Sequence, residues 1–476
     1  MNTSTVNALR VFKKMPCSIC LPAGCGKTAT VTSLAGLMVG QNLRVLVLTH
    51  TNAGASVIRT RLGCLGVPSD EVTVATIDSW SLSYVRHRQE LAGICIPTEP
   101  DWSMHEHMIL NGAIEVLSHL EARQVLLNSH DRLIVDEYQD CSVDQHRLIC
   151  SLSELLPTAV FGDPLQEIFD FNRKTPQVIW DQHVTSIFPA VQLTISPWRW
   201  KNNLSLGNWL LDIREPLQEG KPVNLANSPV KWEQAREPNE IYDTFCTLFP
   251  DNEPVSVISG TRPDQALQVA IGLGGTFALV EAIHSKFILK FAHVVDSGNA
   301  PRIAHDLIGL ANDSAIGVET HFGLNDKLTL AGGNALLDPS RSVIEHQQQA
   351  ISLILQNPAP ATVREAMKSI ERLPNFQLYR HETWNCILTA LKHATLDDST
   401  NVRGHVLKLQ TLVSLRGRFV ASRTVSTTLL AKGLEFENVV VVDAHDLNNK
   451  NLYVALTRGA KSVTVMSHDP VLSPQE

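Results

Sequence analysis

The chain has 476 residues, a net charge of −8, a hydrophobic fraction of 44% and a charged fraction of 18%. One hydrophobic core supports roughly 250–300 residues, so this length predicts at least two domains, and the composition excludes a disordered, collagen-like or coiled-coil chain. The acidic balance argues mildly against nucleic acid as a partner, although a groove between two domains can be basic while the outer surface is acidic.

Hydropathy and cysteine usage indicate a cytoplasmic protein. The longest apolar runs, such as Val439 to Val442, are far shorter than the roughly 20 residues that a membrane-spanning helix needs. The nine cysteines lack the paired spacing of a disulfide scaffold. Cys17 and Cys20 form a C-x-x-C pair, which can hold half a zinc site or a redox disulfide, but their place in an apolar run favours two buried strand cysteines.

A phosphate-binding loop follows this first predicted strand. The run Leu21-Pro-Ala-Gly-Cys-Gly-Lys27-Thr28 precedes a helical stretch, which is the context that a P-loop requires, although Leu21 replaces the first glycine and an ordinary glycine-rich turn is the alternative. Lys27 is expected to reach the β- and γ-phosphates, and the Thr28 hydroxyl to bind Mg²⁺. The predicted nucleotide-binding residues of this loop are Ala23, Gly24, Cys25, Gly26, Lys27, Thr28 and Ala29.

Short β-branched runs that end in polar residues predict further strands of parallel sheets, and therefore an α/β fold. These runs are Arg44 to Thr49, Arg132 to Val135, Ala159 to Phe161, Pro254 to Ser259 and Asn438 to Asp443. Ligands of open α/β sheets bind outside the carboxyl ends of the strands, so the polar residues that follow each run mark the expected site.

An acidic pair, Asp136 and Glu137, directly follows one of these strands. Asp136 can hold Mg²⁺, and Glu137 can polarise the water that attacks a phosphate. A solvated acidic turn is the alternative, but the phosphate loop upstream favours a catalytic pair.

Helical apolar spacing marks two insertions. The longer one, 284–418, contains predicted helices at Gln347 to Leu355, Val363 to Ile370 and Trp384 to Leu391. The shorter one, 83–128, has apolar positions at helical spacing around Ile114.

Together with four further runs, these motifs make the sequence resemble the UvrD/Rep family of superfamily 1 DNA helicases. The resemblance rests on four runs in the family's order: Asp136-Glu-Tyr-Gln-Asp140, Gly162-Asp-Pro-Leu-Gln-Glu-Ile-Phe169, Lys432-Gly-Leu-Glu-Phe436 and Tyr453-Val-Ala-Leu-Thr-Arg458. It implies two RecA-like P-loop NTPase domains with helical insertions. The first domain would comprise 1–82 and 129–195, and the second 196–283 and 419–476.

The resemblance also implies roles for residues of the ATP site. Gln166 looks like the sensor that couples the γ-phosphate to the DNA, while Arg199 and Arg458 are similar to the family's arginine fingers. Trp198 takes the place of the tyrosine that stacks on adenine. Gly433 and Glu435, in the third run, complete the expected nucleotide-binding set.

The expected DNA contacts come from three further positions of resemblance. The run Thr49-His-Thr-Asn52 is similar to a T-F-T-N motif and assigns His50 and Asn52 to DNA, and Thr76 and Asp78 belong to a run similar to T-x-H-S-F. Phe171 falls where the family has a base-stacking tryptophan, and stacking tolerates any base.

The resemblance implies an ATP- and Mg²⁺-dependent translocase or helicase that moves 3′ to 5′ on single-stranded DNA. The alternative is a DNA-gated regulatory ATPase that controls a partner nuclease, as in anti-phage systems, and a third hypothesis is a P-loop kinase unrelated to nucleic acid. Few residues follow Arg458, so any nuclease is expected to be a separate subunit.

Overall fold

A computed structural model describes residues 3–97, 102–169, 176–234, 253–282, 286–334, 345–397, 400–416 and 420–474. The chain forms two compact units. The first comprises Met1–Val230, Leu447–Ser462 and Val471–Glu476, and the second comprises Lys231–Asp446 and Val463–Pro470.

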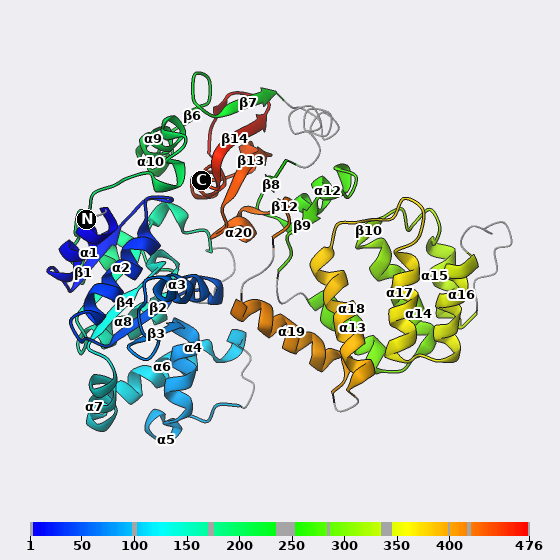
Figure 1. Ribbon diagram of the computed structural model, residues 1–476, viewed down its shortest axis with the longest axis horizontal. Coiled ribbons are helices and arrows are strands. Elements are labelled where there is room, and N and C mark those ends of the chain that lie inside the picture. Colours follow the sequence, from blue (N-terminus) through cyan, green and yellow to red (C-terminus); the bar gives the residue numbers. More distant parts are fainter. Residues whose placement is uncertain are drawn as a thin grey trace. The chain divides into compact units, whose positions relative to one another are not determined.

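The first unit is built on a five-stranded parallel sheet with the strand order β1-β5-β4-β2-β3 (Figure 1). Its strands are β1 (Cys17–Cys20), β2 (Val45–Thr49), β3 (Val72–Thr76), β4 (Arg132–Val135) and β5 (Thr158–Gly162). Successive side chains point to opposite faces, so Val45 and Val47 join one apolar core while Leu46 and Leu48 join the other. Both faces of the sheet are therefore buried, as expected for parallel strands.

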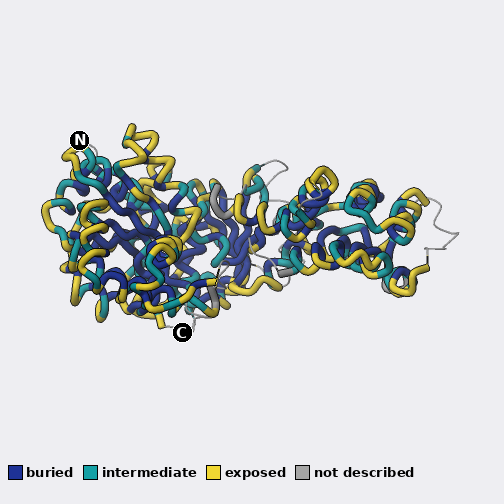
Figure 2. The backbone as a smooth tube through the Cα atoms, turned by 90° about the horizontal axis from the view of Figure 1, so that it is seen from below, coloured by how far each residue is buried: buried dark blue, intermediate teal, exposed yellow. Residues whose placement is uncertain are grey.

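Helices cover both faces of this sheet. One core contains residues of α1 (Thr3–Phe12), α2 (Lys27–Val39) and α3 (Asn52–Cys64). The other contains residues of α4 (Ile77–Arg86), α5 (Gln89–Ala92), α6 (Trp102–Ser118), α7 (Leu120–Ser129) and α8 (Val143–Ser153). Buried positions follow the strands and the inner helix faces, and exposed positions lie on the outer turns (Figure 2). The helices of residues 83–128 thus pack on the second core.

The remaining elements of the first unit come from two distant parts of the chain. They are α9 (Leu204–Asp212), α10 (Arg214–Gln218) and α21 (Asn449–Leu456), together with the antiparallel pair β6 (Val223–Asn224) and β15 (Val471–Leu472). The predicted domain boundaries would assign these residues to the second domain, and those boundaries stay a prediction. The compact unit includes them because the buried Trp200 lies against the phosphate loop and donates through Nε1 to Gly459 O at 2.7 Å.

The second unit contains a six-stranded sheet with the order β7-β14-β13-β8-β12-β9. The strands are β7 (Lys231–Gln234), β8 (Val255–Ser259), β9 (Ala278–Leu279), β12 (Arg423–Ser426), β13 (Phe436–Val442) and β14 (Gly459–Ser467). The pairing is parallel between β7 and β14, between β13 and β8, between β8 and β12 and between β12 and β9. Helix α12 (Pro263–Gly272) and the short α20 (Thr428–Ala431) flank this sheet.

A helical bundle is inserted between β9 and β12. It contains α13 (Lys286–Asp296), α14 (Ala300–Asn312), α15 (Leu324–Ala331), α16 (Glu345–Gln356), α17 (Pro360–Ile370), α18 (His381–Leu396) and α19 (Val402–Arg416), with the short pair β10 (Ala315–Ile316) and β11 (Gln377–Leu378). These helices share one apolar core. The bundle is anchored to the strand segment through Glu281, whose carboxylate accepts hydrogen bonds from Thr383 N at 3.2 Å and Thr383 Oγ1 at 2.8 Å.

The structure confirms the predicted α/β class with parallel sheets flanked by helices, which is the arrangement of RecA-like P-loop domains. The five predicted strands correspond to β2, β4, β5, β8 and β13. Strand β3 escaped prediction because it lies at the sheet edge and exposes Thr73, so it lacks a continuous apolar run. Within the described ranges, no helix combines the length and the apolar character needed to cross a bilayer.

Candidate nucleotide-binding site

The phosphate loop connects β1 to α2, and two of its glycines have positive φ angles. Gly24 has φ +67° and Gly26 has φ +85°. A Cβ atom on Gly24 would lie 2.7 Å from the Trp200 ring, and one on Gly26 would lie 3.1 Å from the Trp198 ring. Both the backbone angles and the close approach of the two indoles therefore require glycine at these positions.

Leu21 occupies the position of the missing first glycine without disturbing this loop. Its side chain is fully buried in the core beneath α2, and its backbone N–H donates to Gly162 O at 3.1 Å. The neighbouring cysteines differ from each other. Cys17 is buried as predicted, but the prediction of a buried Cys20 was wrong, because the last residue of β1 faces away from the core that holds Cys17 and Ile19.

Lys27 begins α2 and lies beside both carboxylates of the acidic pair. Its Nζ forms an ion pair with Glu137 Oε2 and lies 3.9 Å from Asp136 Oδ1. Burial lowers the pKa of Lys27, but Glu137 and Asp136 outweigh that effect and hold the pKa above its ordinary value. Burial raises the pKa of Asp136 to about 6, and the nearby Lys27 opposes that shift. Lys27 is thus a buried cation paired chiefly with Glu137.

Glu137 has a left-handed backbone, with φ 56°, that turns its side chain toward Lys27. Gln139 holds the same carboxylate, since Gln139 Nε2 donates to Glu137 Oε2 at 2.7 Å. The other amide atom, Gln139 Oε1, accepts a hydrogen bond from Asp163 N at 3.0 Å. One amide therefore connects the turn after β4 to the turn after β5.

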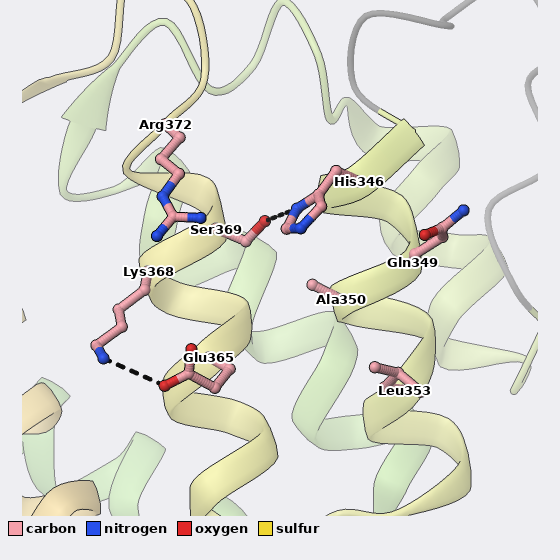
Figure 3. Close-up of a pocket in the computed structure, with 8 residues that line it drawn as sticks. All are labelled: His346, Gln349, Ala350, Leu353, Glu365, Lys368, Ser369 and Arg372. Atoms are coloured by element: carbon pink, nitrogen blue, oxygen red, sulfur yellow. Dashed lines mark hydrogen bonds and ion pairs between the residues drawn. The ribbon is translucent and has the colours of Figure 1, made fainter.

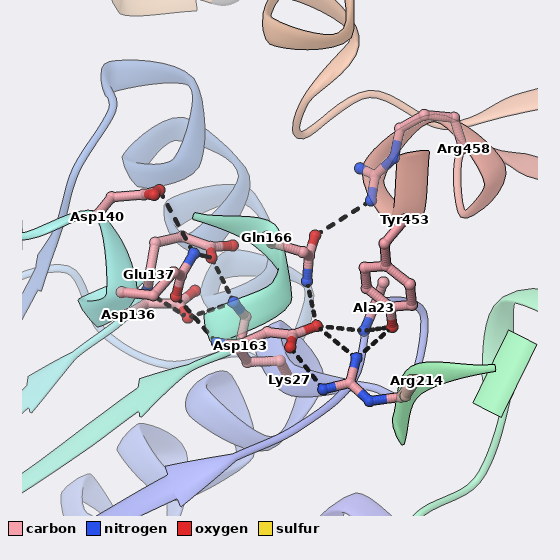
Figure 4. A network of polar contacts seen from close by, with 11 residues as sticks. Ala23, Lys27, Asp136, Glu137, Asp140, Asp163, Gln166, Arg214, Tyr453 and Arg458 are labelled. Carbon is pink, nitrogen blue, oxygen red and sulfur yellow. Dashed lines mark hydrogen bonds and ion pairs between the residues drawn. The ribbon is translucent and has the colours of Figure 1, made fainter. Parts of the chain in front are cut away.

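Asp163 is the hub of the polar network (Figure 4). Its side chain is fully buried, and Oδ2 accepts hydrogen bonds from Ala23 N at 3.0 Å and Gln166 Nε2 at 2.9 Å. Arg214 donates to both oxygens, with Nη2 2.7 Å from Oδ1 and Nη1 3.1 Å from Oδ2. Asp163 thus joins the phosphate loop, the sensor glutamine and α10.

Arg458 lies at the same network. The residue is 2% exposed, and its Nη2 donates to Gln166 Oε1 at 3.1 Å. It also donates through Nε to Val454 O at 3.0 Å and through Nη2 to Thr457 Oγ1 at 3.0 Å. These hydrogen bonds hold the Arg458 guanidinium beside the Gln166 amide.

Arg199, the other predicted arginine finger, and Trp198, which is predicted to stack on adenine, both contact the phosphate loop. Arg199 N donates to Gly24 O at 3.0 Å, and its Nη1 donates to Thr457 O. Trp198 is 43% exposed, with its ring edge against Gly26. The structure therefore places Trp198 and Arg199 against the loop and Arg458 beside Gln166, and the roles expected of these three residues stay predictions.

The site fits a nucleoside triphosphate with Mg²⁺. Gly26 leaves the first amides of α2 without a side-chain cap, which is the arrangement that binds phosphate at a helix N-terminus. Lys27 supplies a buried ammonium group, and the Asp136 carboxylate and the Thr28 hydroxyl are oxygen ligands of the kind that Mg²⁺ takes. Cys25 and Ala29 flank these groups in the loop and in the first turn of α2.

The remaining predicted residues lie elsewhere. Gly433 and Glu435 belong to the second compact unit, in the turn between α20 and β13, where Gly433 has φ +82°. His50 and Asn52 follow β2, and Thr76 ends β3. Phe171 lies outside the described residues.

The polar groups after β3 are engaged locally. Thr76 Oγ1 caps α4 by accepting a hydrogen bond from Ser79 N at 3.0 Å. Asp78 Oδ1 accepts a hydrogen bond from Gln145 Nε2 at 2.7 Å. Thr76 therefore caps α4, and Asp78 connects the first turn of α4 to α8.

The second unit has a cavity of about 270 Å³ between α16 and α17 (Figure 3). Among its lining residues, Lys368 pairs with Glu365 at 3.2 Å and His346 Nδ1 contacts Ser369 Oγ at 3.0 Å. It is a groove between two neighbouring helices and contains none of the predicted site residues.

Sequence reasoning missed Gln139, Asp163, Trp200, Arg214 and Tyr453 as site residues. Gln139, Asp163 and Tyr453 lie inside the runs that carry the family resemblance, so their motifs were available as a signal. Arg214 had none, since it lies in an ordinary amphipathic stretch 51 residues from Asp163 and 239 from Tyr453.

Comparison with known proteins agrees with this geometry. A family model described as an AAA domain matches residues 5–172, which contain the phosphate loop and the acidic pair. Domains of this family occur in UvrD/Rep-like superfamily 1 helicases. No curated protein matches the sequence. The fold, the loop geometry and this match support a P-loop NTPase, a class that binds a nucleotide and usually Mg²⁺.

Proposed function

We propose that this protein is an ATP-driven translocase or helicase of the UvrD/Rep type that moves 3′ to 5′ along single-stranded DNA. The observation that carries the proposal is the Gln166 amide, which binds Arg458 with its oxygen and Asp163 with its nitrogen. A shift in the position of either Arg458 or Asp163 would therefore alter the hydrogen bonds of this amide. The order of the family motifs and the AAA-domain match support the same class.

The chemistry follows from the groups around Lys27. An incoming triphosphate competes with Glu137 for the Lys27 ammonium, so binding ATP frees Glu137 to accept a proton from the attacking water. The bond between the γ-phosphorus and the bridging oxygen then breaks, which leaves ADP and inorganic phosphate. Arg458 stabilises the charge that develops on the transferred group. Mg²⁺, when bound at Thr28 and Asp136, neutralises phosphate charge.

The proposed DNA contacts and the phosphate loop lie at the same end of the sheet, where the carboxyl ends of its strands meet. Strands β2 and β3 are neighbours, with Thr49 paired to Thr76, so the residues after them lie side by side. His50 and Asn52 follow β2, and Asp78 follows β3. The carboxyl ends of parallel strands meet at one edge, so a strand of DNA lying there would be near the ATP site without overlapping it.

Single-stranded DNA is expected to raise the rate of ATP hydrolysis by about tenfold or more, because bound DNA favours the arrangement in which Gln166 and Arg458 engage the nucleotide. Phosphate release with and without an oligonucleotide lacking secondary structure measures this directly, and double-stranded DNA of equal length is the control. Equal rates in all three conditions would contradict a DNA-coupled ATPase and favour a nucleic-acid-independent enzyme such as a kinase.

A further inference from the structure

Arg214 forms a bridge that the proposed ATPase reaction does not by itself require. Its guanidinium donates to both carboxylate oxygens of Asp163 and, through Nη1, to the Tyr453 hydroxyl. The guanidinium carbon also lies 4.9 Å from the centre of the Tyr453 ring. The Tyr453 hydroxyl also accepts a hydrogen bond from Ala23 N at 3.2 Å. Four segments therefore meet here: α10, the turn after β5, α21 and the phosphate loop.

Tyr453 is connected to Arg458 through Thr457. The Tyr453 carbonyl accepts hydrogen bonds from Thr457 N at 3.0 Å and Thr457 Oγ1 at 2.8 Å. The same Thr457 Oγ1 accepts a hydrogen bond from Arg458 Nη2 at 3.0 Å. A shift of Tyr453 therefore moves the threonine that orients the Arg458 guanidinium.

Helix α21 is also held at its other end. Lys450, in its first turn, forms an ion pair with Glu167, which follows the sensor Gln166. The helix thus has one charged contact to the residue after Gln166, and one buried contact, through Tyr453, to Arg214 and Asp163. Asn449 Nδ2 adds a third contact by donating to Leu217 O at 2.9 Å, and Arg458 lies two residues beyond the end of the helix.

We propose that Arg214 is a positioning residue for ATP hydrolysis. By bridging Asp163 to Tyr453, it fixes the C-terminal end of α21 so that Arg458 is held next to Gln166. This inference rests on the proposed function, because it assumes that Arg458 acts on the nucleotide. Arg214 itself is occupied by Asp163, and burial beside that carboxylate makes the pair difficult to separate.

The chain offers a matched control in Arg44. Arg44 also donates to both oxygens of one carboxylate in the first unit, with Nε 3.0 Å from Asp131 Oδ2 and Nη2 3.0 Å from Asp131 Oδ1. This pair lies at the amino ends of β2 and β4, which is the opposite edge of the sheet from the phosphate loop. Arg44→Ala removes an ion pair of the same bidentate geometry, although a more exposed one, without touching the site.

The test is basal ATP hydrolysis, without DNA, of Arg214→Ala and Tyr453→Phe in the wild-type and Arg458→Ala backgrounds. In the wild-type background, Arg214→Ala is expected to lower kcat by about 100-fold and to change KM by less than about threefold, with Tyr453→Phe showing a smaller fall of the same kind. Arg214→Lys keeps the charge without the fork and should recover kcat only in part. In the Arg458→Ala background, each change should lower kcat by less than about twofold further, because residues that act through one group are not additive.

Equal losses in both backgrounds, or a loss matched by Arg44→Ala, would overturn the inference and assign Arg214 a general structural role. Tyr453→Phe removes one hydroxyl group and keeps the ring, so it tests the bridge even if Arg214→Ala does not fold. Hydrogen exchange of residues 447–462 gives a second measurement, expected to be faster in Tyr453→Phe and unchanged in Arg44→Ala. Unchanged exchange in Tyr453→Phe would refute the bridge, whereas a wild-type protein that does not hydrolyse ATP would refute the proposed function.

Discussion

Lys27→Ala is expected to abolish ATP turnover, with kcat falling by at least about 100-fold, because removing one preorganised donor to a developing charge costs about 10²–10³ in rate. The structure gives a further reason. The buried Lys27 ammonium neutralises Glu137 and Asp136, so without it two carboxylates repel an incoming triphosphate. Both kcat and ATP affinity should therefore fall. Lys13→Ala, which removes an exposed lysine after α1, should leave both unchanged.

Glu137→Gln separates binding from chemistry at the same site. The amide cannot accept the proton of the attacking water, so kcat should fall by about 10²–10⁴ while ATP still binds. Phosphate release measures the first effect, and titration with a fluorescent ATP analogue measures the second. Retention of more than about a tenth of wild-type turnover in either variant would remove that residue from its role.

Arg458→Ala is expected to lower kcat by about 10³-fold, the effect of an arginine that stabilises charge in phosphoryl transfer. KM should change little, because such an arginine engages chiefly in the transition state. Steady-state kinetics with ATP distinguish the two parameters. Arg199→Ala is expected to act in the same direction.

Arg458 is 2% exposed, so its removal also leaves a cavity in the first unit. Arg458→Lys is the control for this effect, because lysine fills more of the space and keeps the charge but cannot reproduce the fork. A thermal melt of each variant reports any loss of stability. An unchanged kcat with a raised KM would show that Arg458 only binds nucleotide.

The sequence was most informative where local patterns determine structure. The apolar β-branched runs identified β2, β4, β5, β8 and β13, and the rule that sites form at the carboxyl ends of parallel strands placed Asp136 and Glu137 near Lys27. Helical spacing identified α16, α17 and α18 because their buried residues repeat every three to four positions.

Such local patterns could not predict contacts between segments that are distant in the sequence. Arg214 binds Asp163 and Tyr453 because the fold brings α10 and α21 to the turn after β5. No local spacing in the sequence predicts these contacts. The compact grouping of residues 196–230 with the first sheet has the same origin. It depends on the Trp200 ring filling the space above Gly24, which a sequence read in order does not show.

The most direct measurement of the central proposal is movement along DNA. Streptavidin bound to a biotin at one end of a single-stranded oligonucleotide is displaced only if a motor reaches that end. We predict ATP-dependent displacement from the 5′ end, much slower displacement from the 3′ end, and none from either end with Glu137→Gln. DNA-stimulated hydrolysis without displacement from either end would contradict a translocase and favour a regulatory ATPase that acts on a partner nuclease.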